Sequence, residues 1–145
     1  MKIIAKNKFS QAEYNIIDTY ECGISLEGWE VKSIRQGNVN LKNAFCSIKD
    51  SEMWINNMHI SQYMLVKADF ERPRKLLLHK NEIYRIMSKK DQLSLQIIPS
   101  MIYWKENHIK IEILLVKHLK IHDKRQKIIK KEQDMKMKKI LNYYK

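Results

Sequence analysis

Alternating apolar and polar residues predict several β-strands in the first 116 residues of the chain. Residues 14–24 are rich in Ile, Thr and Tyr, the composition of a long strand. Residues 93–97 and 109–113 alternate apolar with polar side chains at period two, as a half-buried strand does. This part of the chain is therefore predicted to be mainly β.

Two short polar segments between β-forming residues predict hairpins. Asp50–Ser51 separates residues 44–48 from residues 53–55, and Glu106–Asn107 separates residues 101–104 from the strand at residue 109. Polar residues of these types favour tight turns. Consecutive strands joined in this way run antiparallel.

Two segments have helical rather than strand spacing. Residues 30–35 place Val31 and Ile34 on one helical face and predict a short helix before Gly37. Residues 75–89 carry apolar side chains near helical spacing and predict a longer one. Several antiparallel strands with one or two helices favour a small closed or partly open β-barrel of the OB type, although periodicity does not fix its topology.

Charge divides the chain near Lys117. Residues 117–145 hold eleven Lys or Arg and three Asp or Glu, a net charge of +8, whereas residues 1–116 hold 17 and 13, a net charge of +4. We therefore expect a β-barrel domain at residues 1–116 and a basic tail at residues 117–145.

The tail has the pattern of a helix that needs a partner. Asp123 followed by Gln126 resembles a helix capping box, with Asp123 as the N-cap. The apolar stripe further along is short, and like charges such as Lys127 and Lys131 repel each other at i, i+4. We expect the tail to be disordered when free and helical when a polyanion neutralises it.

Overall composition narrows the class of protein. A net charge of +12 favours a polyanionic partner, nucleic acid or an acidic membrane surface. Two cysteines, Cys22 and Cys46, are too few for a disulfide scaffold and fit a reducing compartment. Apolar runs are shorter than the roughly 18 residues of a membrane span, and the N-terminus lacks a signal peptide pattern. The expected location is the cytoplasm, without a membrane partner.

Catalytic and metal-binding patterns are missing from the sequence. His118 and His122 are four residues apart but have only Asp123 beside them, so solvated histidines explain them better than a metal site. Cys22 and Cys46 lie in predicted strands, where buried packing is more common than nucleophilic chemistry. The sequence has neither a phosphate-binding glycine loop nor a nucleophile elbow. We expect a binding protein rather than an enzyme, with no metal and no cofactor.

Three segments are candidates for binding a polyanion. Arg72, Arg74 and Lys75 form either a loop that contacts phosphates or an ordinary solvated loop, two readings that the sequence supports equally. Tyr103–Lys105 provides either a stacking platform for bases or, more commonly, a barrel strand whose aromatic side chains belong to the core. The basic tail favours polyanion binding over a flexible solubilising extension.

Four motifs in order give the chain a recognisable family resemblance. They are Gly28–Ser33 (GWEVKS), Met58–Ser61 (MHIS), Arg74–His79 (RKLLLH) and Asp123–Arg125 (DKR). Together they resemble small protein B, the SsrA-binding protein family, from Asn7 through the tail. The resemblance implies a non-enzymatic protein with an OB-type barrel that binds the tRNA-like part of transfer-messenger RNA. It delivers this RNA to stalled ribosomes in bacterial trans-translation.

The resemblance also implies functional residues. The RNA-binding surface would include Asn7, Glu21, Leu77 and Lys110. Glu21 would accept hydrogen bonds from base amino or ribose hydroxyl groups, Lys110 would meet phosphate, and Leu77 would touch a base or ribose. Asp123, Lys124 and Arg125 match the family's tail motif, which would act in the ribosome. We expect the basic residues that follow to act with this motif against ribosomal RNA: Lys127, Lys130 and Lys131.

The chain departs from the family pattern where body meets tail. The family usually has a glycine there, and this chain reads Lys117-His118-Leu119-Lys120 instead, which predicts a stiffer joint. Two rival classes stay open at this stage: a non-specific OB-type binder of single strands, and a small hydrolase or nuclease with a basic groove. A monomer is expected.

Overall fold

The computed structural model describes residues 1–8, 13–119 and 121–143, of which residues 121–124 and 140–143 are described by their backbone alone. The chain divides into two compact units. The first is built around Ile16–Lys117, and the second combines the residues just before Ile16 with the segment from His118 onward. The division of function between residues 1–116 and 117–145 stays a prediction.

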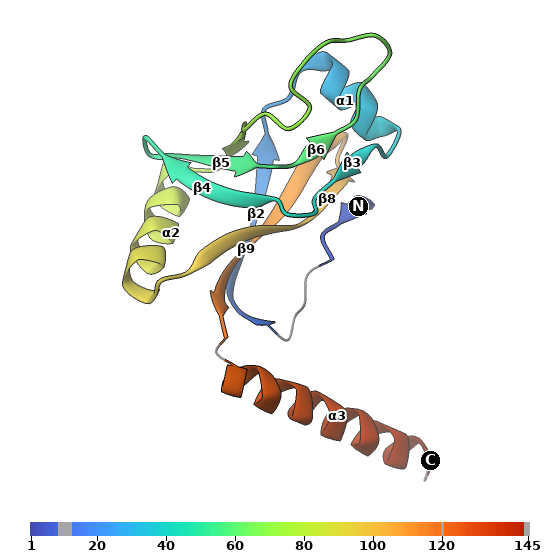
Figure 1. Ribbon diagram of the computed structural model, residues 1–145, viewed down its shortest axis with the longest axis vertical. Helices are drawn as coiled ribbons and strands as arrows, with labels where there is room; N and C mark the ends of the chain where they lie inside the picture. Colours follow the sequence, from blue (N-terminus) through green and yellow to red (C-terminus); the bar gives the residue numbers. More distant parts are fainter. Residues whose placement is uncertain (9–12, 120, 144–145) are drawn as a thin grey trace. The chain divides into compact units, whose positions relative to one another are not determined.

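Seven strands form one antiparallel sheet, and six of them close into a ring (Figure 1). Their order is β1-β8-β4-β5-β7-β2-β9, and β8 also pairs with β9, so the six strands from β8 to β9 close on themselves while β1 adds to the edge of β8. The predicted mainly β, OB-type barrel is confirmed. The strands are β1 (Lys2–Lys6), β2 (Tyr14–Ile24), β4 (Phe45–Lys49), β5 (Glu52–Asn56), β7 (Arg74–Leu77), β8 (Gln96–Lys105) and β9 (His108–His118).

Both predicted hairpins are confirmed. In the β4–β5 hairpin Lys49 pairs with Glu52, and the two turn residues have φ of 54° and 60°. In the β8–β9 hairpin Lys105 pairs with His108, and φ is 51° and 64° at the turn. Positive φ at both central residues is the signature of the type I′ turn, whose twist matches that of the flanking strands.

The helices partly correct the sequence prediction. Helix α1 (Gly28–Arg35) lies where a short helix was expected, and a small second sheet pairs β3 (Val39–Asn40) with β6 (His59–Ile60). Helix α2 (Lys80–Leu93) begins five residues later than predicted, because residues 74–77 belong to β7. Their burial alternates at period two, with Leu76 buried and Leu77 exposed, which is strand geometry.

The strand predicted at residues 93–97 is wrong at its start. Leu93 still belongs to α2, and Ser94 ends that helix in the left-handed conformation, with φ of 53°. Strand β8 then runs from Gln96 through a register shift between Pro99 and Met101 to Lys105. The two strands predicted at residues 93–97 and 101–104 are therefore one strand with a bulge.

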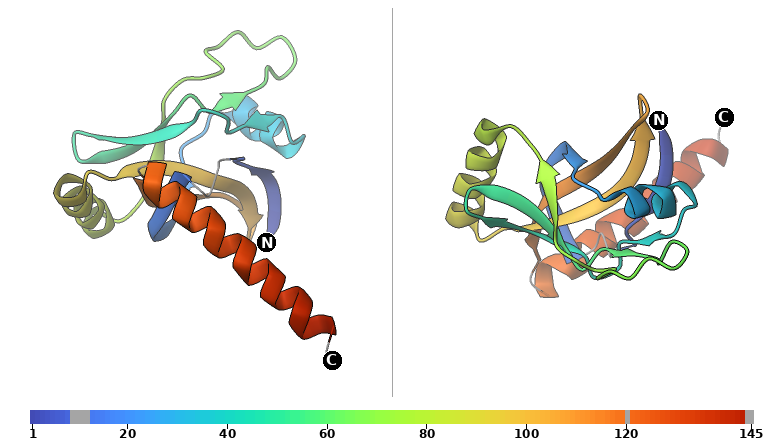
Figure 2. Two further views of the ribbon diagram at one scale, coloured as in Figure 1. Left: turned by 60° about the horizontal axis from the view of Figure 1, so that its bottom comes forward. Right: turned by 90° about the horizontal axis from the view of Figure 1, so that it is seen from above.

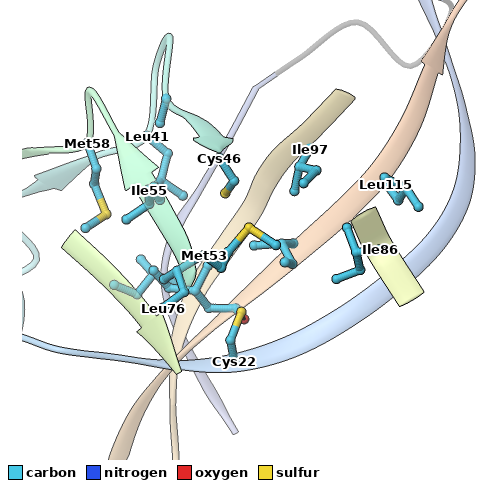
Figure 3. Close-up of a cluster of buried hydrophobic side chains, with 14 of the residues drawn as sticks. Cys22, Leu41, Cys46, Met53, Ile55, Met58, Leu76, Ile86, Ile97 and Leu115 are labelled. Carbon is cyan, nitrogen blue, oxygen red and sulfur yellow. The ribbon is translucent and has the colours of Figure 1, made fainter. Parts of the chain in front are cut away.

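The core fills the interior of the ring (Figure 3). Met53, Ile55, Leu76 and Ile97 are buried there, and Ile86 reaches the same cluster from α2. Cys22 and Cys46 are free and buried, which confirms their predicted packing role. Burial raises the pKa of the Cys22 thiol to about 12 and that of Cys46 well above its usual value.

The second unit contains helix α3 (Ile121–Tyr143), the continuous helix that Figure 2 shows in orange to red. It begins two residues before Asp123, so Asp123 lies in the first turn and the prediction that it is the N-cap is wrong. Leu119 N donates to Glu13 O at 2.8 Å, and Lys127 Nζ donates to Tyr14 O. The tail is helical in this structure. Its disorder in the free protein and its folding on a polyanion stay predictions.

Candidate nucleic-acid interface

Three neighbouring strands, β7, β2 and β9, present a common outer face. Each strand also contributes a buried residue: Leu76 from β7, Cys22 from β2 and Ile111 from β9. Because side chains alternate along a strand, the residues beside them point outward. Leu77, Glu21 and Lys110 therefore lie on one surface of the ring, brought together from distant parts of the chain.

A groove of about 470 Å³ follows this surface, and we call it the main groove. Among its lining residues are Glu21, Lys75, Leu77 and Lys110, four of the predicted RNA-binding residues. It also carries the side chains of Glu52, Lys80 and Glu82, so charges of both signs surround an apolar centre. A binding site for a nucleotide requires such a combination, because a base or ribose has apolar faces and polar edges.

Gly23 lies opposite Leu77 in the β2–β7 pairing and lines the main groove with it. A Cβ atom at position 23 would meet Leu77 Cβ and Cδ1 at 3.4 Å. The absence of a side chain here leaves Leu77 unobstructed, and 52% of Leu77 is exposed. The exposed side chain of Leu77 offers an apolar surface that an RNA base or ribose can cover.

Glu21 is held in place by two donors from β8. Tyr103 Oη donates to Glu21 Oε2, and Lys105 Nζ lies 3.3 Å from the same oxygen. The Tyr103 hydrogen bond, helped by Lys105 and Lys110 and opposed by desolvation, holds the pKa of Glu21 below its usual value. Burial and the same hydrogen bond raise the pKa of Tyr103. Glu21 is therefore an ionised, oriented acceptor, and Lys105 Nζ lies 3.4 Å from its second oxygen, Oε1.

The cations of the main groove differ in how far they are neutralised. Lys75 lies 3.4 Å from Glu52, and Lys80 lies 3.6 Å from the same carboxylate. Lys110 is half-buried and forms no salt bridge with any residue that the structure describes. Lys110 is therefore the side chain best placed to neutralise a phosphate.

Asn7 is not among the residues that line the main groove. It follows β1, where its backbone N–H donates to Ser100 O at 2.7 Å and its side-chain amide donates to Pro99 O at 2.8 Å. These bonds fix the end of β1 against the bulge of β8. Its role in RNA binding stays a prediction.

The structure corrects the prediction for Arg74. Its side chain is fully buried, with Nε donating to Glu30, Nη1 donating to Met58 O at 2.6 Å and Nη2 donating to Phe70 O at 3.0 Å. Burial lowers the pKa of Arg74. A guanidinium whose donors are used inside the protein cannot contact an RNA phosphate, so this part of the prediction is wrong.

Arg72 belongs to the same network of charges. Its Nη2 donates to Glu30 Oε1 at 2.5 Å, and its Nε lies 3.7 Å from Glu27. The side chain is 28% exposed, and its two acidic neighbours compete with any phosphate. Arg72 and Arg74 thus connect the loop before β7 to the start of α1, and an RNA contact of Arg72 stays a prediction.

The predicted tail residues lie along α3. Arg125, Lys130 and Lys131 are exposed on it, whereas Lys127 is half-buried. The side chains of Asp123 and Lys124 lie outside the described residues. The role of all six in the ribosome stays a prediction.

Sequence reasoning missed Gly23 as a residue of the groove, and it missed the contacts of Tyr103 and Lys105 with Glu21. Tyr103 had been considered as a stacking platform or a core residue, and at 2% exposure it is a core residue whose hydroxyl reaches Glu21. Trp104 is half-buried. Gly23 could have been predicted from the strand alternation of β2, because residues 21 and 23 lie on the same face and Glu21 was already expected at the RNA surface.

The described residues contain no group of three or more His, Cys, Asp or Glu that could hold a metal ion. Within the same residues, no helix combines the length and apolar character needed to cross a membrane.

Comparison with known proteins identifies the family. The family model described as SmpB protein matches residues 4–143. The chain belongs to the SmpB family. Among SmpB relatives, the SsrA-binding protein of Mycoplasmopsis pulmonis (strain UAB CTIP) is 49% identical over 143 residues, covering 98% of this chain and 99% of the relative. The SsrA-binding protein of Pseudothermotoga lettingae (strain ATCC BAA-301 / DSM 14385 / NBRC 107922 / TMO) is 46% identical over 147 residues, covering 99% of each.

A solved SmpB structure has the same fold. The chain in "tmRNA-SmpB: a journey to the center of the bacterial ribosome" matches with a TM-score of 0.67 at 34% identity, covering 86% of this chain and 93% of that chain. The predicted family is thereby confirmed over nearly the full length of the chain.

Proposed function

We propose that this SmpB-family chain binds the tRNA-like part of transfer-messenger RNA and delivers it to stalled ribosomes in trans-translation. It acts as an RNA-binding protein in the cytoplasm and not as an enzyme. The observation that carries the proposal is the main groove, where Glu21, Leu77 and Lys110 meet on one face of an SmpB barrel.

The groove can distinguish a folded RNA from a generic polyanion. Lys110 neutralises a phosphate, which supplies affinity without sequence information. Leu77 covers the apolar face of a base or ribose, and Glu21 accepts from an amino or 2′-hydroxyl group. Because a carboxylate repels phosphates, Glu21 favours only RNA that places a donor at that position.

The tail supplies a second, less specific contact. Helix α3 has 23 residues and is therefore about 34 Å long. Its exposed basic side chains, among them Arg125, Lys130 and Lys131, suit a surface of ribosomal RNA, where phosphates are dense. The tail contributes to ribosome rescue, and the barrel contributes RNA recognition.

A competition experiment tests the proposal. The full-length protein is titrated with a tRNA-like RNA and with an unstructured RNA of equal length at the same salt concentration. We expect the folded RNA to bind at least tenfold more tightly, the equivalent of about 1.4 kcal/mol. Equal affinity for both would instead identify a non-specific OB-type binder of single strands.

A further inference from the structure

A second hollow adjoins the main groove at Leu77, and we call it the side hollow. Its volume is about 330 Å³, and it shares Gly23, Leu77 and Lys110 with the main groove. Its other wall consists of Arg35 from the last turn of α1 with Trp104 and His108 from the β8–β9 hairpin. A strand of RNA in the main groove would therefore reach the side hollow by passing over Leu77.

The side hollow has a different charge from the main groove. Three carboxylates line the main groove, whereas the side hollow has none among its described lining residues. Arg35 and Lys110 supply its positive charge, and neither forms a salt bridge with any residue in the described part of the chain. Two cations that form no salt bridge, in a hollow whose described lining has no carboxylate, complement an anion.

Trp104 holds the guanidinium of Arg35 in this position. Arg35 Cζ lies 5.8 Å from the centre of the Trp104 ring, within the range of a cation–π interaction. A guanidinium restrained by an aromatic face loses less conformational entropy when it binds phosphate than a free one does. Arg35 is exposed, so a ligand has access to it.

We propose that the side hollow is a second RNA subsite, which takes the nucleotide adjacent to the one at Leu77. Arg35 and Lys110 bind the phosphate between the two nucleotides, and Trp104 acts as a positioning residue for Arg35. This inference rests on the proposed function, because it extends the path of the same RNA. It assigns a contact to α1, an element that the main groove does not include.

The test compares two substitutions on the same helix in the full-length protein. Arg35→Gln removes a positive charge from the side hollow. Lys32→Gln is the matched control, because Lys32 is also an exposed cation of α1 over an aromatic ring, Tyr63 at 5.6 Å, but lines neither site. The probe is the tRNA-like RNA, titrated over a series of salt concentrations, with thermal unfolding to verify that each variant is folded.

We expect Arg35→Gln to raise Kd about tenfold and to reduce the slope of log K against log salt by roughly 0.7 to 0.9, the loss of one phosphate contact. Lys32→Gln should stay within about twofold of the wild type and keep its slope. Arg35→Lys should restore the slope but only part of the affinity, since it keeps the charge and loses the planar contact with Trp104. Equal behaviour of Arg35→Gln and Lys32→Gln would overturn the subsite.

Two further variants separate the parts of the proposal. Trp104→Leu should weaken binding in the wild-type protein but not in the Arg35→Gln background; the same loss in both backgrounds would refute its positioning role. Glu21→Ala tests the main groove by itself, because Glu21 lines the main groove and not the side hollow. If it binds like the wild type, the main groove is refuted, whereas the comparison of Arg35 with Lys32 still decides the side hollow.

Discussion

At the scale of the residue, the main feature of the site is a carboxylate on a basic protein. Replacing Glu21 by Ala removes a negative charge, which would help a purely electrostatic binder. We expect weaker binding instead, by about 1–3 kcal/mol, because an RNA donor loses its acceptor. Titration of the tRNA-like RNA measures the change, with Asp91→Ala on the exposed side of α2 as the control for charge. Unchanged or tighter binding by folded Glu21→Ala would favour the non-specific reading.

The buried thiols give a second prediction at this scale. The thiolate is the reactive form, and a pKa of about 12 leaves Cys22 about one part in ten thousand ionised at pH 8. Neither Cys22 nor Cys46 should react with a thiol reagent at pH 8 in the native protein, and both should react after unfolding in guanidinium. Rapid native labelling of one thiol would mean that the ring opens at that strand.

Residue roles could be predicted only as far as a family pattern specified them. Glu21, Leu77 and Lys110 were expected at the RNA surface, and the structure brings them to one groove. Arg74 could not be predicted, because a basic loop looks the same in sequence whether it is exposed or buried. Its partner Glu30 is 44 residues away, so only the fold shows that the two charges meet.

At the scale of the element, the buried carboxylate of α1 joins the helix to β7 and to the loop before it. Removing one partner of a buried ion pair leaves the other charge without compensation. Glu30→Ala should therefore lower the free energy of unfolding by about 3–5 kcal/mol, measured by urea denaturation. Glu71→Ala, which breaks an exposed pair with His59, should cost less than about 1 kcal/mol. Similar losses in the two variants would contradict the role given to Glu30.

Elements with one clear periodicity were predictable, and those with two were not. Strand β2, helix α1 and the two hairpins appear where the sequence placed them. The boundary between β7 and α2 was misplaced because Leu76 and Leu77 fit both the helical spacing of the residues after them and the alternation of a strand. Pairing with Met53 across the sheet decided in favour of the strand.

At the scale of the whole molecule, recognition and rescue are assigned to different parts of the chain. A protein that stops after Leu119 keeps β9 whole and lacks α3. It should bind the tRNA-like RNA within about tenfold of the full chain, because the groove residues remain, but with a smaller salt slope. Its rescue of stalled ribosomes should be lost in a translation assay. Full rescue by this protein would refute the role of the tail.

A pair of double substitutions locates the important part of the tail. Lys124→Ala with Arg125→Ala should impair rescue more than Lys138→Ala with Lys139→Ala, although each pair removes two charges from α3. The reason is that only the first pair belongs to the Asp123–Arg125 motif. Equal effects would mean that the tail acts through total charge alone.

The periodicity of the sequence could not predict how the strands pair to close the barrel. Alternation showed that strands exist, but the pairing of β2 with β9 and of β8 with both β1 and β4 depends on contacts across nearly the whole chain. The pattern of strands and helices favoured a small barrel, the family resemblance implied the same fold, and the structure supplied its strand order.

The closed ring has a consequence for the order of events during folding. Cys22 Sγ contacts Ile111 O across 89 residues, and Glu21 meets Tyr103 across 82, so the contacts that complete the ring close very long loops. Forming such contacts costs conformational entropy of the long loop before the contacts stabilise the chain, and this slows folding. The main groove draws its residues from both sides of this late junction. In a refolding experiment, the ability to bind RNA should therefore emerge only with the slowest phase, after α1 and the β4–β5 hairpin have formed.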